Sequence, residues 1–131
     1  MKRRNILLGI LILLIGACLW RWQVYRSNQR GLSIAGAEGN VICLATLSYL
    51  QDHGGRFPDE KSWRVAITPY LLSGWSISNL DEFSLSPKVA GKNLDDFDHP
   101  CDTPMILWKG SVDHKTVVVS CCGTMDVVPS R

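Results

Sequence analysis

The chain has 131 residues and a net charge of +2, which is unevenly distributed. Residues 1–26 hold five Lys/Arg and no acidic residue, whereas residues 27–131 hold nine Lys/Arg and twelve Asp/Glu. The mildly acidic larger part argues against a nucleic-acid-binding domain, because phosphate contacts need clustered cations. Its length of roughly 100 residues suffices for one small domain with a single core.

An uncharged apolar run occupies residues 6–20, between a basic start and a segment rich in arginine and aromatic residues. Fifteen helical residues span about 22 Å, and counting residues 5–24 makes the length just sufficient for a bilayer core of about 30 Å. Trp20, Trp22 and Tyr25 suit the headgroup level, and the flanking arginines can snorkel. The pattern predicts a single-pass membrane helix. Because the tail ahead of it is only a few residues long, we expect the C-terminal part to be extracytoplasmic.

Three interpretations of this N-terminal segment remain open. The favoured one is an uncleaved signal anchor comprising residues 1–30, followed by an extracytoplasmic domain of residues 31–131. The second is a lipoprotein signal, because Gly16 and Ala17 precede Cys18 at the end of the apolar run, which suits lipidation of Cys18. The third is an ordinary cleaved signal peptide. A buried helix of a cytosolic protein does not fit, since a small domain cannot cover all sides of so apolar a helix.

The first half of the remaining chain predicts helices. Residues 27–36 are polar and contain glycine, so they form either a linker or a weak continuation of the first helix. Residues 37–52 predict a helix that is apolar nearly all round and therefore needs cover on more than one side. His53-Gly54-Gly55 ends it, because glycine accepts the left-handed cap conformation. Residues 62–72 predict a second short helix, capped by Ser62 and limited by Pro69.

The second half predicts loops followed by strands. Residues 74–91 are rich in turns, and residues 93–103 form an acidic loop. Residues 105–108 are apolar, residues 115–122 are β-branched and predict a central strand, and Gly123-Thr124 closes a hairpin onto residues 125–128. The fold expected from this order is α+β: a transmembrane helix, then a helix packed on a small antiparallel sheet.

Three short motifs carry a resemblance to a known family. The first motif is LSYLQDHGGRFP at residues 47–58, in which a helix end with Tyr is followed by a glycine turn and an aromatic-Pro pair. The second is WR at residues 63–64, which precedes PYL at residues 69–71. The third is the closing hairpin that follows His114. Together they resemble the type II secretion major pseudopilins and other pilin-like proteins. Two features depart from the family: the chain has no recognisable prepilin peptidase signal, and Cys122 stands where the family has the hairpin Asp.

The resemblance implies a non-enzymatic, membrane-anchored structural or accessory subunit of a type II secretion or type IV pilus-like system. It also implies that the helix lies in the bacterial inner membrane and that the C-terminal domain lies in the periplasm. The partners it implies are the membrane, other pilin-like or secretion-system subunits, and further copies of the chain, with no nucleic acid. The alternative function is a periplasmic lipoprotein, lipidated at Cys18, with a small binding domain.

Four of the five cysteines, namely Cys43, Cys101, Cys121 and Cys122, lie outside the apolar run on the side expected to be oxidising. Cys121 and Cys122 are neighbours on a predicted strand, so their side chains should point to opposite faces. We expect one disulfide, from Cys101 to Cys121 or to Cys122. Cys43 could instead pair with the inward member of the adjacent pair, and all four also fit as small buried apolar residues.

Metal and catalytic sites are weaker hypotheses. The acidic loop holds four carboxylates, on Asp95, Asp96, Asp98 and Asp102, which are oxygen ligands of the kind calcium prefers. The resemblance also favours calcium, because major pseudopilins bind it in their C-terminal region, although no Asp-x-Asp-x-Asp-Gly pattern is present. A zinc site lacks a Cys-x-x-Cys pair, and no signature of a Cys/His hydrolase accompanies the three histidines. We therefore expect no catalytic residues and no other cofactor.

Overall fold

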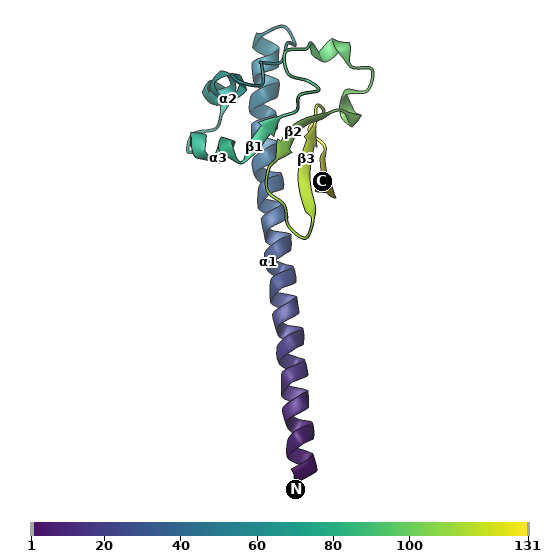
Figure 1. Ribbon diagram of the computed structural model, residues 1–131. Coiled ribbons are helices and arrows are strands. Elements are labelled where there is room, and N and C mark those ends of the chain that lie inside the picture. The colour runs from purple at the N-terminus through teal and green to yellow at the C-terminus, as the bar shows by residue number, and fades with distance from the viewer. Residues whose placement is uncertain (1, 131) are drawn as a thin grey trace. The chain divides into compact units, whose positions relative to one another are not determined.

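The computed structural model describes residues 2–130, without the side chains of residues 2–8, 10, 11, 77 and 78. The described chain is α+β, with one long N-terminal helix, α1 (Lys2–Asp52), and one four-stranded antiparallel sheet (Figure 1). It divides into two compact units, residues 2–31 and residues 32–130, which are described separately below.

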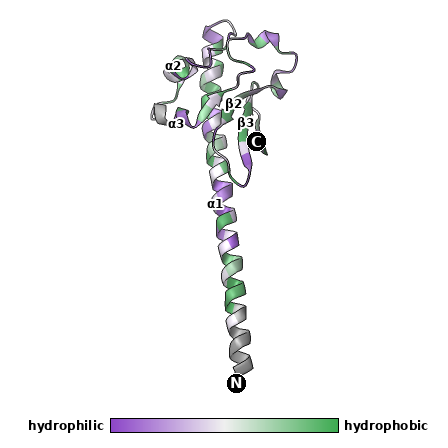
Figure 2. Ribbon diagram, in the orientation of Figure 1, coloured by the Kyte–Doolittle hydropathy of each residue, from purple (hydrophilic) through white to green (hydrophobic). Residues whose placement is uncertain are grey.

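The N-terminal unit consists of α1 residues alone. Every described side chain from residue 12 to residue 27 is exposed, including Leu13 at 75% and Trp20 at 73%. The apolar stretch is seen as green ribbon in Figure 2. Among the described residues, one helix, α1, is long and apolar enough to cross a membrane. Arg26 places its guanidinium 3.9 Å from the ring centre of Trp22, a cation–π contact.

Two alternatives were considered for residues 27–36, a linker or a continuation of the first helix. The structure shows the continuation, because these residues are part of α1. Within the C-terminal unit, Leu32 and Ala35 are buried in a cluster with Val117 of the sheet. Packing of the sheet against Leu32 and Ala35 offsets the weak helix propensity of this polar, glycine-containing segment. Most helical stability in proteins comes from such tertiary packing.

The sheet is a meander with the strand order β1-β2-β3-β4, and every neighbouring pair is antiparallel. Its strands are β1 (Phe83–Leu85), β2 (Pro104–Trp108), β3 (Lys115–Ser120) and β4 (Met125–Pro129). The main buried cluster joins Ile42, Ala45 and Leu50 of α1 to residues of β1, β2 and β3. The expected arrangement of residues 37–52 as a helix against an antiparallel sheet is therefore confirmed.

The connection between helix and sheet holds short helices. They are α2 (Trp63–Ile67), the 3₁₀ turn η1 (Thr68–Tyr70), α3 (Ile77–Asp81), η2 (Leu94–Asp96) and η3 (Pro100–Asp102). The second predicted helix is confirmed as α2 followed by η1. However, Ser62 does not cap it through its side chain, because its Oγ donates to the backbone oxygen of Asp59 at 3.5 Å.

Residues 74–91 contain the expected turns, and they also form α3 and the edge strand β1, which the sequence did not predict. Three-residue β1 is too short to show an alternating pattern. The expected placement of Cys121 and Cys122 on a strand was wrong. The central strand ends at Ser120, so Cys121 and Cys122 lie in the turn after β3 and not on a strand. The hairpin onto β4 is confirmed, with Val117 paired to Val127 and Val119 paired to Met125.

Candidate functional site

One side of α1 in the C-terminal unit is left without cover, and we call it the open face. It comprises five exposed residues spaced three or four apart: Ile34, Ala37, Asn40, Leu44 and Ser48. This spacing places them on a single stripe of the helix. Ile34 is 59% exposed and Leu44 is 63% exposed, whereas neighbouring Ile42 and Ala45 are buried under the sheet. The part of α1 that carries the core therefore also presents apolar side chains to its surroundings.

Two glycines let the sheet approach α1 closely. A Cβ added to Gly39 would lie 3.0 Å from Cγ2 of Val119 and 3.6 Å from Cε1 of Phe83, and a Cβ on Gly36 would overlap the Sδ of Met125. Sequence reasoning did not assign these glycines a role. The signal was available in their spacing of three residues within a helix, next to the small residues Ala35 and Ala37.

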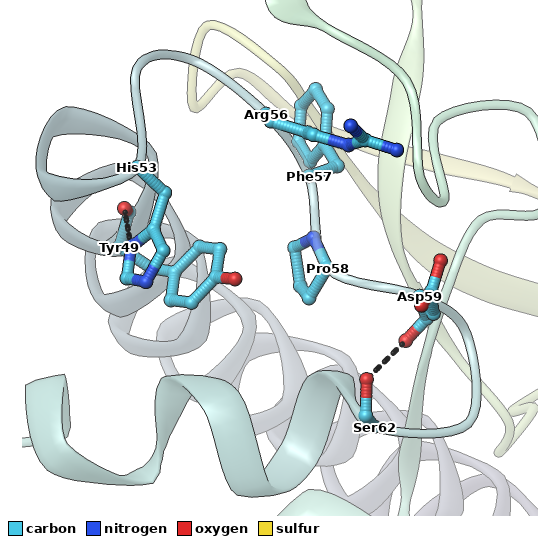
Figure 3. Close-up of a pocket in the computed structure, with 7 residues that line it drawn as sticks. All are labelled: Tyr49, His53, Arg56, Phe57, Pro58, Asp59 and Ser62. Atoms are coloured by element: carbon cyan, nitrogen blue, oxygen red, sulfur yellow. Dashed lines mark hydrogen bonds between the residues drawn. The ribbon is translucent and has the colours of Figure 1, made fainter.

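A cavity of about 330 Å³ lies where α1 ends, lined by the residues drawn in Figure 3: Tyr49, His53, Arg56, Phe57, Pro58, Asp59 and Ser62. The helix ends as expected, because Gly54 and Gly55 have positive φ and the Gly55 N–H donates to the Leu50 oxygen at 2.7 Å. The rings of Tyr49 and His53 stack with centroids 3.8 Å apart. These are the residues that carry the first motif of the family resemblance.

Two polar side chains of this cavity bond to backbone oxygens. His53 Nδ1 lies 2.9 Å from the backbone oxygen of Tyr49, and the Ser62 hydroxyl donates to a backbone carbonyl (Figure 3). Phe57 is buried, and its N–H donates to the Lys92 oxygen at 2.8 Å, which anchors the extended segment after the helix. The contacts described in this cavity hold the end of α1 against the following chain.

Nearby, the Tyr70 hydroxyl donates a 2.7 Å hydrogen bond to the Asp52 carboxylate. This bond raises the pKa of Tyr70, since the protonated phenol is the form that donates it, and partial burial and the charge of Asp52 act in the same direction. It connects η1 to the last residue of α1.

The structure contains a disulfide between Cys101, in η3, and Cys122, in the turn after β3. This is one of the two pairings expected from the sequence. Cys43 and Cys121 are buried thiols, and Cys18 is an exposed thiol on α1. Cys121 points inward and Cys122 outward, as expected for neighbours, although a turn and not a strand orients them.

The two buried thiols resist ionisation. Burial raises the pKa of Cys43 to about 11, with a smaller contribution from the nearby Cys121. Burial likewise raises the pKa of Cys121 to about 11. A thiol of this kind is a poor nucleophile at neutral pH, because the thiolate is the reactive form. The described residues therefore give neither cysteine the activated state that a hydrolase would need.

The four aspartates proposed for calcium lie along the loop but do not meet in one site. Asp95 and Asp96 are on η2, where the Asp96 carboxylate accepts the Asn93 N–H at 3.0 Å and completes a capping box. Asp102 is on η3, and Asp98 lies between the two turns. Among the described side chains, no three His, Cys, Asp or Glu residues form a group able to hold a metal ion. The geometry thus lends no support to the calcium or zinc hypotheses.

Comparison with known proteins gives no match: no protein-family model, no curated protein and no solved structure matches this chain. The described residues supply an apolar segment, an open helix face and a domain that contains a disulfide.

Proposed function

We propose that this protein is a membrane-anchored, pilin-like subunit that works by packing its helix against neighbouring subunits. The observation that carries the proposal is the dual character of α1. A single helix contains the apolar run suited to a bilayer and, further along, a segment that is covered by the sheet on one side and open on the other. A helix used only as an anchor would not need the apolar open face.

The side chains of the open face support a protein neighbour. Ile34, Ala37 and Leu44 are apolar and exposed, and Asn40 and Ser48 on the same face are small and uncharged, which suits close packing of helices by ridges into grooves. A charged surface would be expected on a helix that faces only water. The occupant we propose is the same segment of a second copy, or of another chain with the same architecture.

The cysteines support an extracytoplasmic domain. Cys101 and Cys122 form a disulfide, and disulfides persist in the periplasm but are rare in the cytosol. The closing of a small domain by a disulfide is typical of exported proteins. We therefore propose that residues 31–131 face the periplasm and that the apolar run lies in the inner membrane.

An intact mass of the purified protein tests the anchor. The proposal expects the full-length chain with one disulfide. Cleavage before Cys18 together with added acyl mass would select the lipoprotein alternative, and cleavage without acyl mass would select a secreted domain.

Site-specific photocrosslinking in intact cells tests the subunit role. A photoreactive residue at Leu44 should give crosslinks to a second copy or to another pilin-like chain. The matched control is Val65 on α2, which is 77% exposed but lies off the open face. Equal crosslinking from both positions, or none from Leu44, would contradict the proposed packing.

A further inference from the structure

The cysteines left over by the Cys101–Cys122 disulfide form a pair in the core. Cys43 is 2% exposed and Cys121 is 4% exposed, and both belong to the main buried cluster between α1 and the sheet. They come from segments far apart in the sequence, the middle of α1 and the turn after β3. The charge of Cys121 also contributes to the raised pKa of Cys43.

The turn that carries Cys121 is held against α1. A Cβ placed on Gly123 would lie 3.7 Å from the Sγ of Cys43, so the turn two residues beyond Cys121 faces that sulfur. The Cys121 N–H donates to the Thr103 oxygen at 3.0 Å, and the Gly123 N–H donates to the Ser120 oxygen at 3.0 Å. The neighbouring Cys122 is tied to Cys101. These contacts hold the Cys121 backbone in a defined position beside α1.

We infer that Cys43 and Cys121 are the site of a second disulfide, which joins α1 covalently to the turn between β3 and β4. The inference rests on the proposed function only in requiring an oxidising compartment. It differs from the Cys101–Cys122 bond, which joins two exposed loops, because it would fasten the two layers of the fold to each other through the core.

The reaction is a thiol–disulfide exchange with a disulfide-bearing oxidant, either a protein oxidant or oxidised glutathione. One thiol loses its proton and attacks a sulfur of the oxidant, whose S–S bond breaks to form a mixed disulfide. The second thiol loses its proton and displaces the oxidant's remaining sulfur. The two cysteines are oxidised by two electrons, and the oxidant leaves with both of its sulfurs as thiols.

The structure also indicates when the bond forms. Both thiols are buried and protonated in the folded domain, so an oxidant neither reaches them nor finds much thiolate there. The exchange therefore takes place while the β3–β4 hairpin is still open, before the sheet closes on α1. The structure described here has both cysteines as thiols.

Thiol trapping on the full-length protein tests the inference. Membranes are acidified, the protein is extracted and unfolded, free thiols are alkylated, and the remaining disulfides are mapped by mass spectrometry. The expected result is two linkages, Cys101–Cys122 and Cys43–Cys121, with alkylation at Cys18 alone. Recovery of alkylated Cys43 and Cys121 beside an intact Cys101–Cys122 bond would overturn the inference and leave the proposed compartment standing. Alkylation of all five cysteines would count against that compartment, and the second arm below would then decide the inference.

The second arm uses the full-length C18S variant, reduced, unfolded and refolded in detergent with reduced and oxidised glutathione. The C43A/C121A variant of the same chain, which retains Cys101 and Cys122, is the control. Closing a loop of roughly 80 residues should raise Tm by about 10–20 °C over the control. Glutathione adducts or free thiols at Cys43 and Cys121 would overturn the inference, as would a Cys43–Cys121 bond that lowers Tm.

Discussion

At the scale of single residues, the two helix glycines show how the same sequence feature has different consequences. Gly39 lies against Val119 and Phe83, which are both at most 1% exposed and cannot move. Gly36 lies against Met125, a flexible side chain that is 42% exposed. The space beside each glycine, and not its helix propensity, therefore decides what a methyl group would do there.

Alanine at these two positions should separate packing from propensity. Each change gains about 1 kcal/mol of helix propensity. At Gly39 the gain is outweighed by overpacking, which costs about 1–3 kcal/mol, whereas at Gly36 the Met125 side chain can swing away. We expect G39A to be less stable than G36A by about 1–2 kcal/mol, measured by urea unfolding of the full chain in detergent. Equal midpoints for the two variants would show that the sheet does not press on Gly39.

The buried thiols predict a fall in stability at high pH. Their pKa values are about 11 in the folded state and near 9 in the unfolded chain, so between pH 9 and 11 the unfolded state releases protons first. The stabilisation is complete below pH 9 and is lost as the pH rises toward 11, by up to about 2 kcal/mol per thiol. Protein with Cys43 and Cys121 as thiols should show this slope in urea unfolding, and the C43A/C121A variant should lack it. The prediction would be contradicted if the free energy of unfolding changed with pH by the same amount in both proteins.

At the scale of elements, Arg64 fastens α2 to the segment that leads into the sheet. Its Nε donates to the Leu80 oxygen at 3.3 Å and its Nη2 donates to the Phe83 oxygen at 3.1 Å. The planar guanidinium thus binds both carbonyls at the junction between α3 and β1. Its Nε also lies 3.7 Å from the Asp81 carboxylate. Sequence reasoning missed this role, because an arginine in a short helix is ordinarily a solvated residue.

Substitutions should show that the backbone hydrogen bonds matter more than the ion pair. We expect R64A to lower the free energy of unfolding by about 1–3 kcal/mol, since two carbonyls lose their charged donor. R64K should recover little of this, because one ammonium cannot serve both carbonyls. D81N should cost less than about 0.5 kcal/mol, since the Asp81 side chain is 67% exposed. Urea unfolding measures these differences. If D81N lowered the free energy of unfolding as much as R64A does, the ion pair and not the backbone hydrogen bonds would account for the effect of Arg64.

The elements also show where sequence patterns stop being informative. Residues 37–52 and the β3–β4 hairpin could be predicted, because a long apolar helix and a β-branched run closed by a glycine turn are strong local signals. Strand β1 could not, because its three residues become a strand only by pairing with β2. The continuity of α1 through residues 27–36 was left open for the same reason, since the sheet residue that covers this turn lies about 80 positions further along the chain.

At the scale of the whole molecule, the proposed membrane anchor predicts that a charge in the apolar run impairs integration. Leu14 is 60% exposed in the structure, and L14K should disfavour membrane insertion by about 3 kcal/mol. The control is V65K on α2, which adds the same charge at an exposed apolar position of the domain. Alkaline extraction of membranes should release more of L14K than of the wild type or V65K. Complete release of the wild type would contradict the anchor.

Part of the candidate site could be predicted from the sequence and part could not. Because Cys121 and Cys122 are adjacent, one was expected to point inward and the other outward. A disulfide from Cys101 to one of the two was expected, but the sequence did not decide to which. The open face of α1 was expected from an apolar pattern that runs nearly all round the helix. The calcium set was expected from the acidic composition of the loop and from the family resemblance, and the chain instead uses the Asp96 carboxylate to cap a turn.

The amino-acid order by itself determined the apolar segment, the main helix and its glycine end, and the closing hairpin. Each depends on residues within one or two turns of one another, so local propensity and periodicity decide it. The tertiary structure alone decided which side of α1 is covered, which cysteine Cys101 reaches, and whether the acidic side chains converge. These depend on contacts between residues far apart in the chain, where the packing of the sheet on α1 outweighs local preference.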